Sequence, residues 1–265
     1  MMELITPNKF EIKSGDRENE AILTVEPLFH GYGTTLGNAL RRVLLSSLTG
    51  AAVTAVKIKN VPHEFTAVPG VREDMLEIIL NLKLLRLRIA GEEPVRIMLK
   101  VKGEQEVTAG DIDAPSNVEV VNPDLHIADL TDKNSELEME IFAARGRGYV
   151  PTEERDKKDR ELGTIAIDAL YSPVRNVGLK VEAVRVGEIT DYDKLILTVE
   201  TDGTVNPRDT IIDATKILLE QFQLFMNLPE FELSAVKGRK KKAKVEESEG
   251  VAKEEKPKKA RKKKS

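Results

Sequence analysis

The sequence GYGTTLGNALRRVLLSSL, which runs from Gly31 to Leu48, determines how the rest of the chain is interpreted. Six of its apolar residues recur at the i, i+3, i+4, i+7 spacing of one helix face: Leu36, Ala39, Leu40, Val43, Leu44 and Leu48. A hydroxyl at Thr34 or Thr35 can satisfy an unpaired backbone N–H at the helix start, and Gly50 can close the helix end. We therefore expect an amphipathic helix in this stretch.

Arg42 and Leu45 fall on the side of this helix that faces away from the apolar stripe. A leucine beside an arginine on an outer face has two interpretations. Single exposed leucines are common on protein surfaces and need no partner. Alternatively, the helix buries both faces, one within its own fold and one against another protein.

The glycines of the same stretch raise the hypothesis of a nucleotide-binding enzyme. Gly31, Gly33 and Gly37 form the pattern G-x-G-x-x-x-G, which is one residue longer than a dinucleotide fingerprint. Lys57 and Lys59 stand where that fingerprint expects an acidic residue. A turn followed by a helix start is the better interpretation.

Other segments have clear periodicity. Alternation predicts strands over 20–27, 52–59, 165–169, 181–186 and 195–200, and a strand-rich unit over 85–141. A helix is expected over 71–82, with one stripe at Met75, Ile78, Ile79 and Leu82 and a second at Leu76 and Leu80, both interpreted as core. Asn206 and Pro207 predict the N-cap and first residue of a last helix that runs to about Asn227.

The first and last helices together carry more apolar surface than one small sheet can cover, and exposed patches of that size mark association sites. We infer a homodimer about a two-fold axis. Its expected interface residues are Leu36, Leu40, Val43, Leu44, Leu48, Leu218, Phe222 and Phe225. Packing of both helices entirely within one chain remains the alternative on spacing alone.

Composition narrows the function classes. The 265 residues include no cysteine, which excludes disulfides and fits a reducing cytoplasm. No apolar run approaches the ~20 residues that span a membrane, and the N-terminus lacks a secretory pattern. From Lys237 onward there are 14 basic and 5 acidic residues, which leaves 27 basic and 40 acidic residues before it. An acidic body with a basic tail favours protein partners over a fold that wraps nucleic acid.

No catalytic, metal-binding or cofactor-binding set is expected. His30, His63 and His126 are scattered and lack a metal-ligand spacing. No nucleophile elbow, phosphate-binding loop or paired-carboxylate signature occurs in the sequence.

Five ordered stretches resemble the α subunit of bacterial DNA-directed RNA polymerase, in its N-terminal assembly domain. They are the opening stretch, HEFTAVPGVREDMLEIILNLK from His63, RGRGYVP from Arg145, DALYSPVRNV from Asp168 and ETDGTVNPRDTI from Glu200. The resemblance covers roughly residues 23–228. It implies an α+β fold in which two main helices lie on an antiparallel sheet and a strand-rich second domain is inserted. The expected domains are 1–50 plus 176–232 for dimerisation and 51–175 for the insert.

The resemblance also implies a function. The family's dimer binds the β subunit and then β′, and ω and sigma join the complete enzyme. The chain would be an enzyme only as a subunit of this nucleotidyltransferase, with DNA bound through the complex. By motif, Arg42, Leu45, Glu77 and Lys83 would contact β, and Ile167, Asp168, Tyr171 and Val174 would contact β′.

The family continues into a C-terminal DNA-binding domain, which we expect this chain to lack. We expect residues 233–265 to form a disordered charged tail instead, because the segment has too few apolar residues to bury a core. A third hypothesis follows, in which the chain is a nucleic-acid-binding protein that acts non-specifically through this basic tail.

Overall fold

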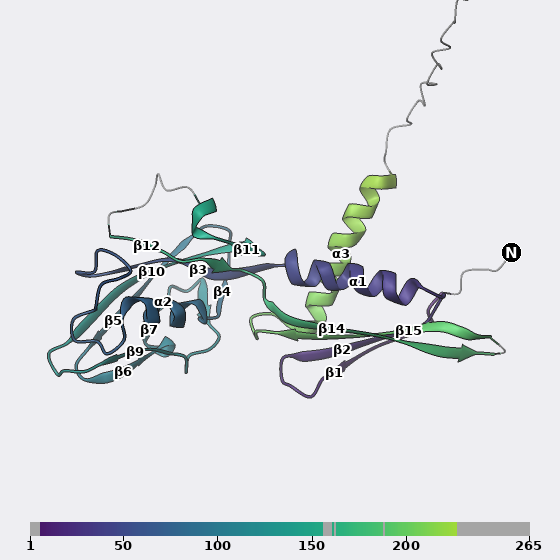
Figure 1. The fold of residues 1–265 in the computed structure, drawn as a ribbon, viewed down its shortest axis with the longest axis horizontal. Coiled ribbons are helices and arrows are strands. Elements are labelled where there is room, and N and C mark those ends of the chain that lie inside the picture. Colours follow the sequence, from purple (N-terminus) through teal and green to yellow (C-terminus); the bar gives the residue numbers. More distant parts are fainter. Residues whose placement is uncertain (1–5, 156–160, 162, 188, 227–265) are drawn as a thin grey trace, which may run out of the picture. The chain divides into compact units, whose positions relative to one another are not determined.

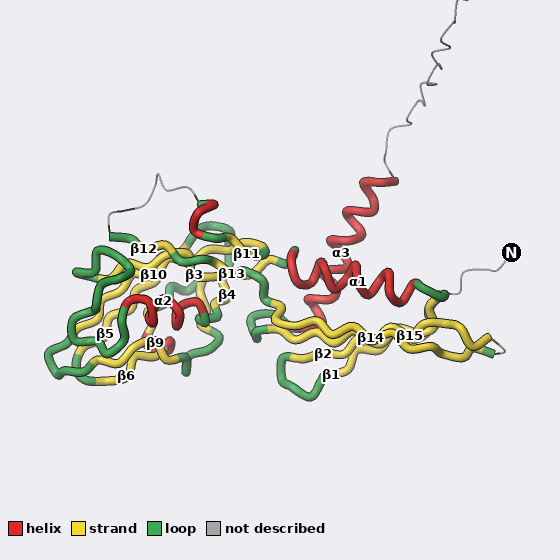
Figure 2. Tube along the Cα trace, viewed as in Figure 1, coloured by secondary structure: helices red, strands yellow, loops and turns green. Residues whose placement is uncertain are grey.

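The computed structural model describes residues 6–155, 161, 163–187 and 189–226. Within these residues the chain folds into three α-helices and mostly antiparallel strands (Figure 1), which confirms the expected α+β class. Most of the strands, drawn yellow in Figure 2, come in the sequence between the first helix and the last two long strands. The expected tail lies outside the described residues.

Strands from both ends of the described chain form one four-stranded antiparallel sheet. Its order is β1-β2-β15-β14, so the N-terminal hairpin pairs with the last hairpin. The members are β1 (Lys9–Ser14), β2 (Glu20–Leu28), β14 (Val174–Val186) and β15 (Ile189–Thr201). Alternation along β2 buries Leu23 and Val25, as the period-two pattern predicted.

Helix α1 (Tyr32–Ser46) lies on this sheet and contacts β14 and β15. Its N-cap is Gly31, which has φ 82° and offers no side chain, so the predicted caps at Thr34 or Thr35 are wrong. The Thr35 hydroxyl instead donates to the Gly31 carbonyl, 3.1 Å away. The left-handed turn that glycine permits starts this helix in place of a hydroxyl cap.

Two glycines mark where α1 approaches the sheet most closely. Gly33 and Gly37 are buried, and a Cβ at Gly37 would lie 2.4 Å from Leu179 Cδ1. The buried face therefore runs through these glycines and Leu44, while Leu36 is 41% exposed. The sequence placed the buried stripe on the wrong residues, because glycine has no side chain that an apolar pattern can register. The two glycines nevertheless lie where the helix is closest to the sheet.

Helix α3 (Pro207–Met226) begins as the sequence predicted. The Asn206 side-chain oxygen accepts the Arg208 N–H at 2.9 Å, which is an N-cap bond. Ile211 and Ala214, in the first half of the helix, join the hydrophobic cluster between α1 and the sheet. The second half contributes no fully buried residue.

The strand-rich region has a second core of its own. It holds a five-stranded sheet in the order β12-β3-β10-β5-β7 and three two-stranded ribbons, β11-β13, β4-β8 and β6-β9. The sheet strands are β3 (Thr49–Ile58), β5 (Val95–Lys102), β7 (Ile112–Asp113), β10 (Glu136–Arg147) and β12 (Ile165–Ala166). The ribbon strands are β4 (Leu87–Ile89), β6 (Gln105–Thr108), β8 (Val118–Val120), β9 (His126–Leu130), β11 (Tyr149–Val150) and β13 (Ala169–Leu170). Two short 3₁₀ turns lie at Ala109–Asp111 and Thr152–Glu154.

Helix α2 (Met75–Lys83) packs in this core between β3 and β9. The Asp74 carboxylate accepts the Glu77 N–H at 2.9 Å while the Glu77 carboxylate accepts the Asp74 N–H, so the two form a capping box. Because Asp74 is the N-cap, the helix begins at Met75 and not at the predicted residue 71.

Gly50 lies in β3 and not at a helix end, which corrects its predicted role. A Cβ at Gly50 would lie only 1.9 Å from the Tyr171 carbonyl oxygen. The backbone at the start of β3 therefore touches the backbone just before β14, and only glycine fits between them.

We expect Gly50→Ala to lower the free energy of unfolding by about 2–4 kcal/mol, because a backbone atom must move to admit the methyl group. Urea unfolding would measure this loss. The matched control is Gly178→Ala in β14, where the nearest atom to the new Cβ is Thr198 Cβ at 3.4 Å. Equal stability of the two variants would contradict the close backbone contact.

Candidate protein interfaces

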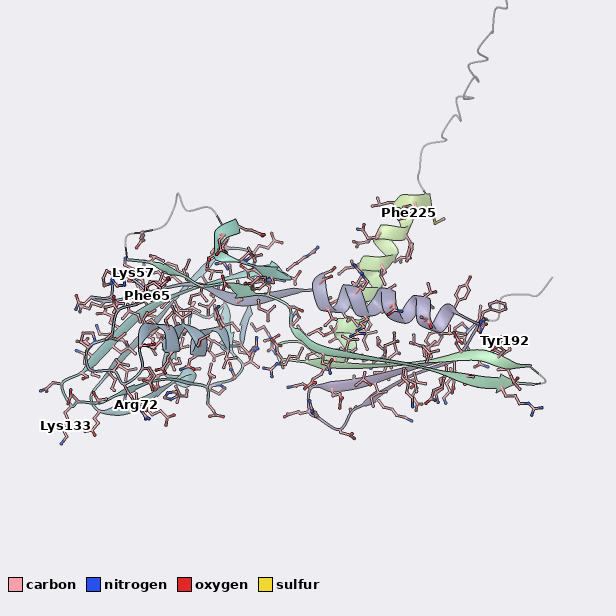
Figure 3. The ribbon with its side chains drawn as sticks, viewed as in Figure 1. Lys57, Phe65, Arg72, Lys133, Tyr192 and Phe225 are labelled. Carbon is pink, nitrogen blue, oxygen red and sulfur yellow. The ribbon has the colours of Figure 1, made fainter. Side chains whose placement is uncertain are left out.

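Exposed apolar side chains gather on the second half of α3. Phe222 is 58% exposed and Phe225 is 68% exposed, although each ring could bury a large apolar area. Phe225 lies near the described end of α3, away from the sheet (Figure 3). The other exposed apolar residues here are Leu219, Leu224 and Met226. A group this large is typical of an association surface.

The predicted dimer-interface residues divide into two groups. Leu44 and Leu48 are 0% and 6% exposed and belong to the chain's own hydrophobic cluster, so they have no surface left for a second copy. Leu40, Val43 and Leu218 are half-buried. Leu36, Phe222 and Phe225 remain exposed. The prediction included core residues because spacing alone does not tell which side of a helix faces the sheet.

Arg42 and Leu45 lie on the exposed face of α1, as the helical pattern predicted. Leu45 is 38% exposed, and its neighbour Arg42 is also exposed. Among the described residues, no carboxylate forms an ion pair with Arg42. An unpaired guanidinium beside an exposed leucine offers a partner one charge and one apolar contact.

Two further predicted contacts have partners within the chain. The Glu77 carboxylate takes part in the α2 cap, so part of its hydrogen-bonding capacity is used there. Lys83, at the end of α2, pairs with Asp168 at 3.0 Å. The family resemblance assigned Lys83 to the β contact and Asp168 to the β′ contact. In the structure these two side chains form an ion pair with each other.

Three of the other predicted contacts are buried. Ile167, Tyr171 and Val174 are 1%, 8% and 6% exposed, so they cannot present whole side chains to another protein. The Tyr171 ring fills the space beside Gly146, where an added Cβ would lie 2.6 Å from the ring. The exposed groups nearby are Leu170 and Tyr149, which face each other across the β11-β13 ribbon.

Helix α2 has a second apolar stripe that lies on the surface and not in the core, where its sequence pattern had predicted it. Leu76, Leu80 and the adjoining Leu84 are 42%, 60% and 52% exposed. Met75, Ile78 and Leu82 on the other side are fully buried and, with Ile79, form the face of α2 that packs in the core. The i, i+4, i+8 spacing of the exposed leucines was the signal that could have identified a surface stripe.

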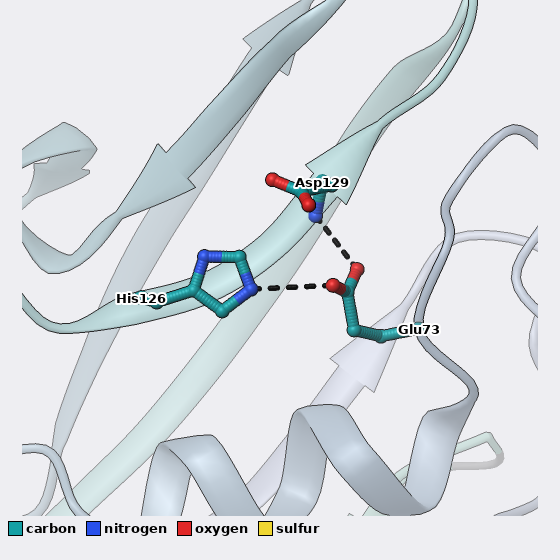
Figure 4. Close-up of side chains that lie close together, drawn as sticks. All are labelled: Glu73, His126 and Asp129. Carbon is teal, nitrogen blue, oxygen red and sulfur yellow. Dashed lines mark hydrogen bonds and ion pairs between the residues drawn. The ribbon is translucent and has the colours of Figure 1, made fainter.

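A cluster of titratable groups lies beside α2 (Figure 4). His126 Nε2 is 3.2 Å from Glu73 Oε1, and Glu73 Oε2 accepts the backbone N–H of Asp129 at 2.7 Å. Burial disfavours a charged imidazole, but hydrogen bonds to Glu73 and Glu106 outweigh burial and raise the pKa of His126. Burial likewise opposes ionisation of Glu73, but the Asp129 N–H and His126 outweigh it and lower the pKa of Glu73.

The other two histidines have ordinary surface partners. His63 forms a hydrogen bond with the Thr66 hydroxyl. His30 lies 3.4 Å from the Asp191 carboxylate, and both side chains are exposed.

The glycine stretch does not form a phosphate cradle. The Gly33 backbone N–H donates to the Asp193 carboxylate at 3.0 Å, so an anionic side chain already occupies the helix start. Gly37 packs against leucines of the sheet. A bound phosphate would meet repulsion from Asp193, which argues against the nucleotide-binding hypothesis.

Residues 56–172 match one family model, described as the RNA polymerase Rpb3/RpoA insert domain. The matched range covers α2 and nearly all of the strand-rich region. The match confirms the resemblance to the assembly domain of the α subunit and supports a role as an RNA polymerase subunit. A separate observation is that no helix in the described residues is long and apolar enough to cross a membrane.

The Lys83–Asp168 pair predicts a pH-dependent contribution to stability. The hydrogen bond from Lys83, followed by that from the Thr152 N–H, lowers the pKa of Asp168 below its ordinary value. Because the folded-state pKa is depressed, the contribution is present above the unfolded-state pKa and is lost as pH falls through the folded-state pKa. We expect Asp168→Asn to cost roughly 0.5–1 kcal/mol at neutral pH, since the pair is partly exposed.

Urea unfolding at a series of pH values would measure this effect, and the difference from wild type should shrink below about pH 4. The control is Asp124→Asn, an exposed aspartate in the turn before β9. A deficit in Asp168→Asn that stays constant down to acidic pH would rule out the charge as its cause.

Proposed function

We propose that the chain is a homodimeric assembly scaffold of RNA polymerase, because residues 56–172 match the RNA polymerase Rpb3/RpoA insert domain. In this proposal the dimer binds β first and β′ second, and thereby joins the two halves of a DNA-directed RNA polymerase in the cytoplasm. The chain contributes no catalytic group. It meets DNA, ω and sigma only within the assembled enzyme.

The observation that carries the proposal is the apolar surface on the second half of α3. Phe222 and Phe225 are largely exposed in the single chain, and burial of such rings is worth roughly 1.5–3 kcal/mol each. A two-fold axis near this surface would bring each ring against the same surface of a second copy. Leu36 on α1 is exposed as well and would extend the interface.

The proposed β surface is the outer face of α1. Arg42 would pair with a carboxylate of β, and Leu45 would pack beside that pair. The exposed leucines of α2 supply a second apolar element, in the helix that also ends with Lys83. Each element combines apolar groups with a cationic one, which suits an interface with an apolar core and a polar rim.

The proposed β′ surface is centred on Asp168. Exposed Leu170 and Tyr149 would provide its apolar contacts. Ile167, Tyr171 and Val174 would act indirectly, because they hold the segment in place from inside the fold.

The nucleic-acid hypothesis depends on the basic tail, which lies outside the described residues. Purification of the tagged chain from its cells would separate the two hypotheses. The scaffold requires the two large polymerase subunits to co-purify with the chain after nuclease treatment.

The proposed dimer predicts that Phe222→Asp gives a monomer, because an unpaired charge would be buried at the interface. Analytical ultracentrifugation would measure the change, with a loss of several kcal/mol in dimer stability. The control is Gln223→Asp, which adds the same charge at the next exposed position of α3. Leu44→Asp is unsuitable, because Leu44 is completely buried within the chain and the variant would unfold. A Phe222→Asp chain that stays dimeric would exclude this surface as the interface.

The proposed β contact predicts that Arg42→Ala retains the dimer but weakens capture of β. Truncation of one partner of a buried charge pair costs roughly 2–5 kcal/mol, which corresponds to at least a thirtyfold loss in affinity. Pull-down of purified β by the tagged dimer would measure it. The control is Arg41→Ala, the neighbouring exposed arginine. Equal loss in the two variants would point to general charge attraction, and no loss in either would exclude the Arg42 contact.

A further inference from the structure

We propose that Glu73, His126 and Asp129 form a binding site for one divalent metal cation such as Zn²⁺. The inference is independent of the scaffold function. One ligand atom from each residue lies within 4.8 Å of the other two. One imidazole nitrogen with two carboxylate oxygens is a donor set that Zn²⁺ accepts, with water as the fourth ligand.

An irregularity in the β6-β9 ribbon brings two of these ligands to one side. His126 and Asp129 are three residues apart, so regular alternation would send their side chains to opposite faces. The register shifts between Val107 and Thr108, so that Thr108 pairs with His126 and Ile127 is passed over. The burial pattern of β9 follows the shift, because Ile127 and Ala128 are both buried while His126 and Asp129 are both half-exposed. A bulge commonly re-aims a side chain in this way.

Glu73 completes the set from a different segment. It lies in the turn directly before Asp74, the N-cap of α2. Its side chain is only 12% exposed, and the Asp129 N–H fixes one carboxylate oxygen while the other faces His126 Nε2. The 3.2 Å between Nε2 and Oε1 is close to the roughly 3.3 Å that separates two ligands of tetrahedral zinc.

A second carboxylate orients the imidazole ring. His126 Nδ1 lies 3.0 Å from Glu106 Oε1, on the side of the ring opposite Glu73. Metal-binding histidines usually donate their second N–H to such a group, which fixes the tautomer and raises the basicity of the ligating nitrogen. The cluster therefore contains an outer partner as well as three ligands.

The charged groups around the three ligands favour a cation. Glu73, Glu106 and Asp129 supply three carboxylates, against which Arg72 supplies one guanidinium, 3.1 Å from Asp129 Oδ2. The N-terminus of α2 opposes a cation, but this effect costs less than about tenfold in affinity. The three ligands also line one solvent-open pocket with Glu77 and Leu80, so a metal and its water ligand have access.

A bound cation would tie the start of α2 to β9. Titration of the full-length chain with ZnCl₂ in a non-chelating buffer should give one site per chain by calorimetry. At a free zinc concentration about 100 times Kd, the Tm should rise by roughly 5–10 °C. Affinity should fall at lower pH, since His126 must be neutral to bind metal.

Three variants distinguish a metal site from a purely hydrogen-bonded cluster. His126→Ala should abolish binding. Glu106→Gln keeps all three ligands and should lower affinity about 10–100-fold. Arg72→Ala should raise affinity several-fold, because it removes the cation that competes for Asp129. Arg72 and Glu106 are exposed, so these two variants should keep the fold.

The control is His63→Ala, which removes a surface histidine from a different loop and should leave zinc affinity unchanged. The proposal fails if wild type shows no zinc-dependent rise in Tm. It also fails if His126→Ala binds as tightly as wild type, or if Arg72→Ala binds more weakly. Any of these results would leave the cluster as a hydrogen-bonded link between α2 and β9.

Discussion

The contact of α1 with β14 and β15 is the interaction on which the rest of the structure depends. Gly33 and Gly37 remove the side chains that would hold the first half of the helix away from the sheet. Leu44 then fills the cluster under the second half and is completely buried. Because the inner face is fixed by close packing, the opposite face, with Arg42 and Leu45, is held in a defined orientation. An interface residue on a rigid helix loses little freedom on binding.

The position of α1 also determines how the strand-rich region joins the sheet. Strand β3 follows α1 after only two residues, and Gly50 touches the Tyr171 carbonyl oxygen where the chain returns toward β14. Arg86 and Asp202, largely buried, lie 3.7 Å apart across the same junction, and the Arg88 Nε–H donates to the Thr204 carbonyl. Burial lowers the pKa of Arg86 more than Asp202 raises it, so this pair is a costly one to bury. Its value lies in specifying geometry, since removal of either partner would leave the other charge buried alone.

The sequence predicted features that depend on local chemistry and missed those that depend on distant neighbours. The Asn206 cap, the alternation in β2 and the outward face of Arg42 follow from spacing within one element, and all three appear in the structure. The role of Gly50 depends on Tyr171, which is more than a hundred residues away. The exposure of Leu80 depends on tertiary packing, because only one face of the 9-residue helix α2 packs in the core. The placement of His126 and Asp129 on one side of β9 depends on a register shift that no residue pattern predicts.

The Lys83–Asp168 pair bears on how a symmetric dimer could assemble an asymmetric enzyme. In the proposed scaffold Lys83 belongs to the β surface and Asp168 to the β′ surface, yet their side chains meet at 3.0 Å. A large subunit that covers one of them therefore covers the other or stands directly beside it. In the proposed scaffold, one copy would then have room for one large subunit at this place, although it would carry both surfaces. The proposed dimer would have two such places, so the first subunit to bind would leave the second copy free for the other. Steric overlap within each chain would in this way convert two identical protomers into one β-binding and one β′-binding copy, without any difference in their folds.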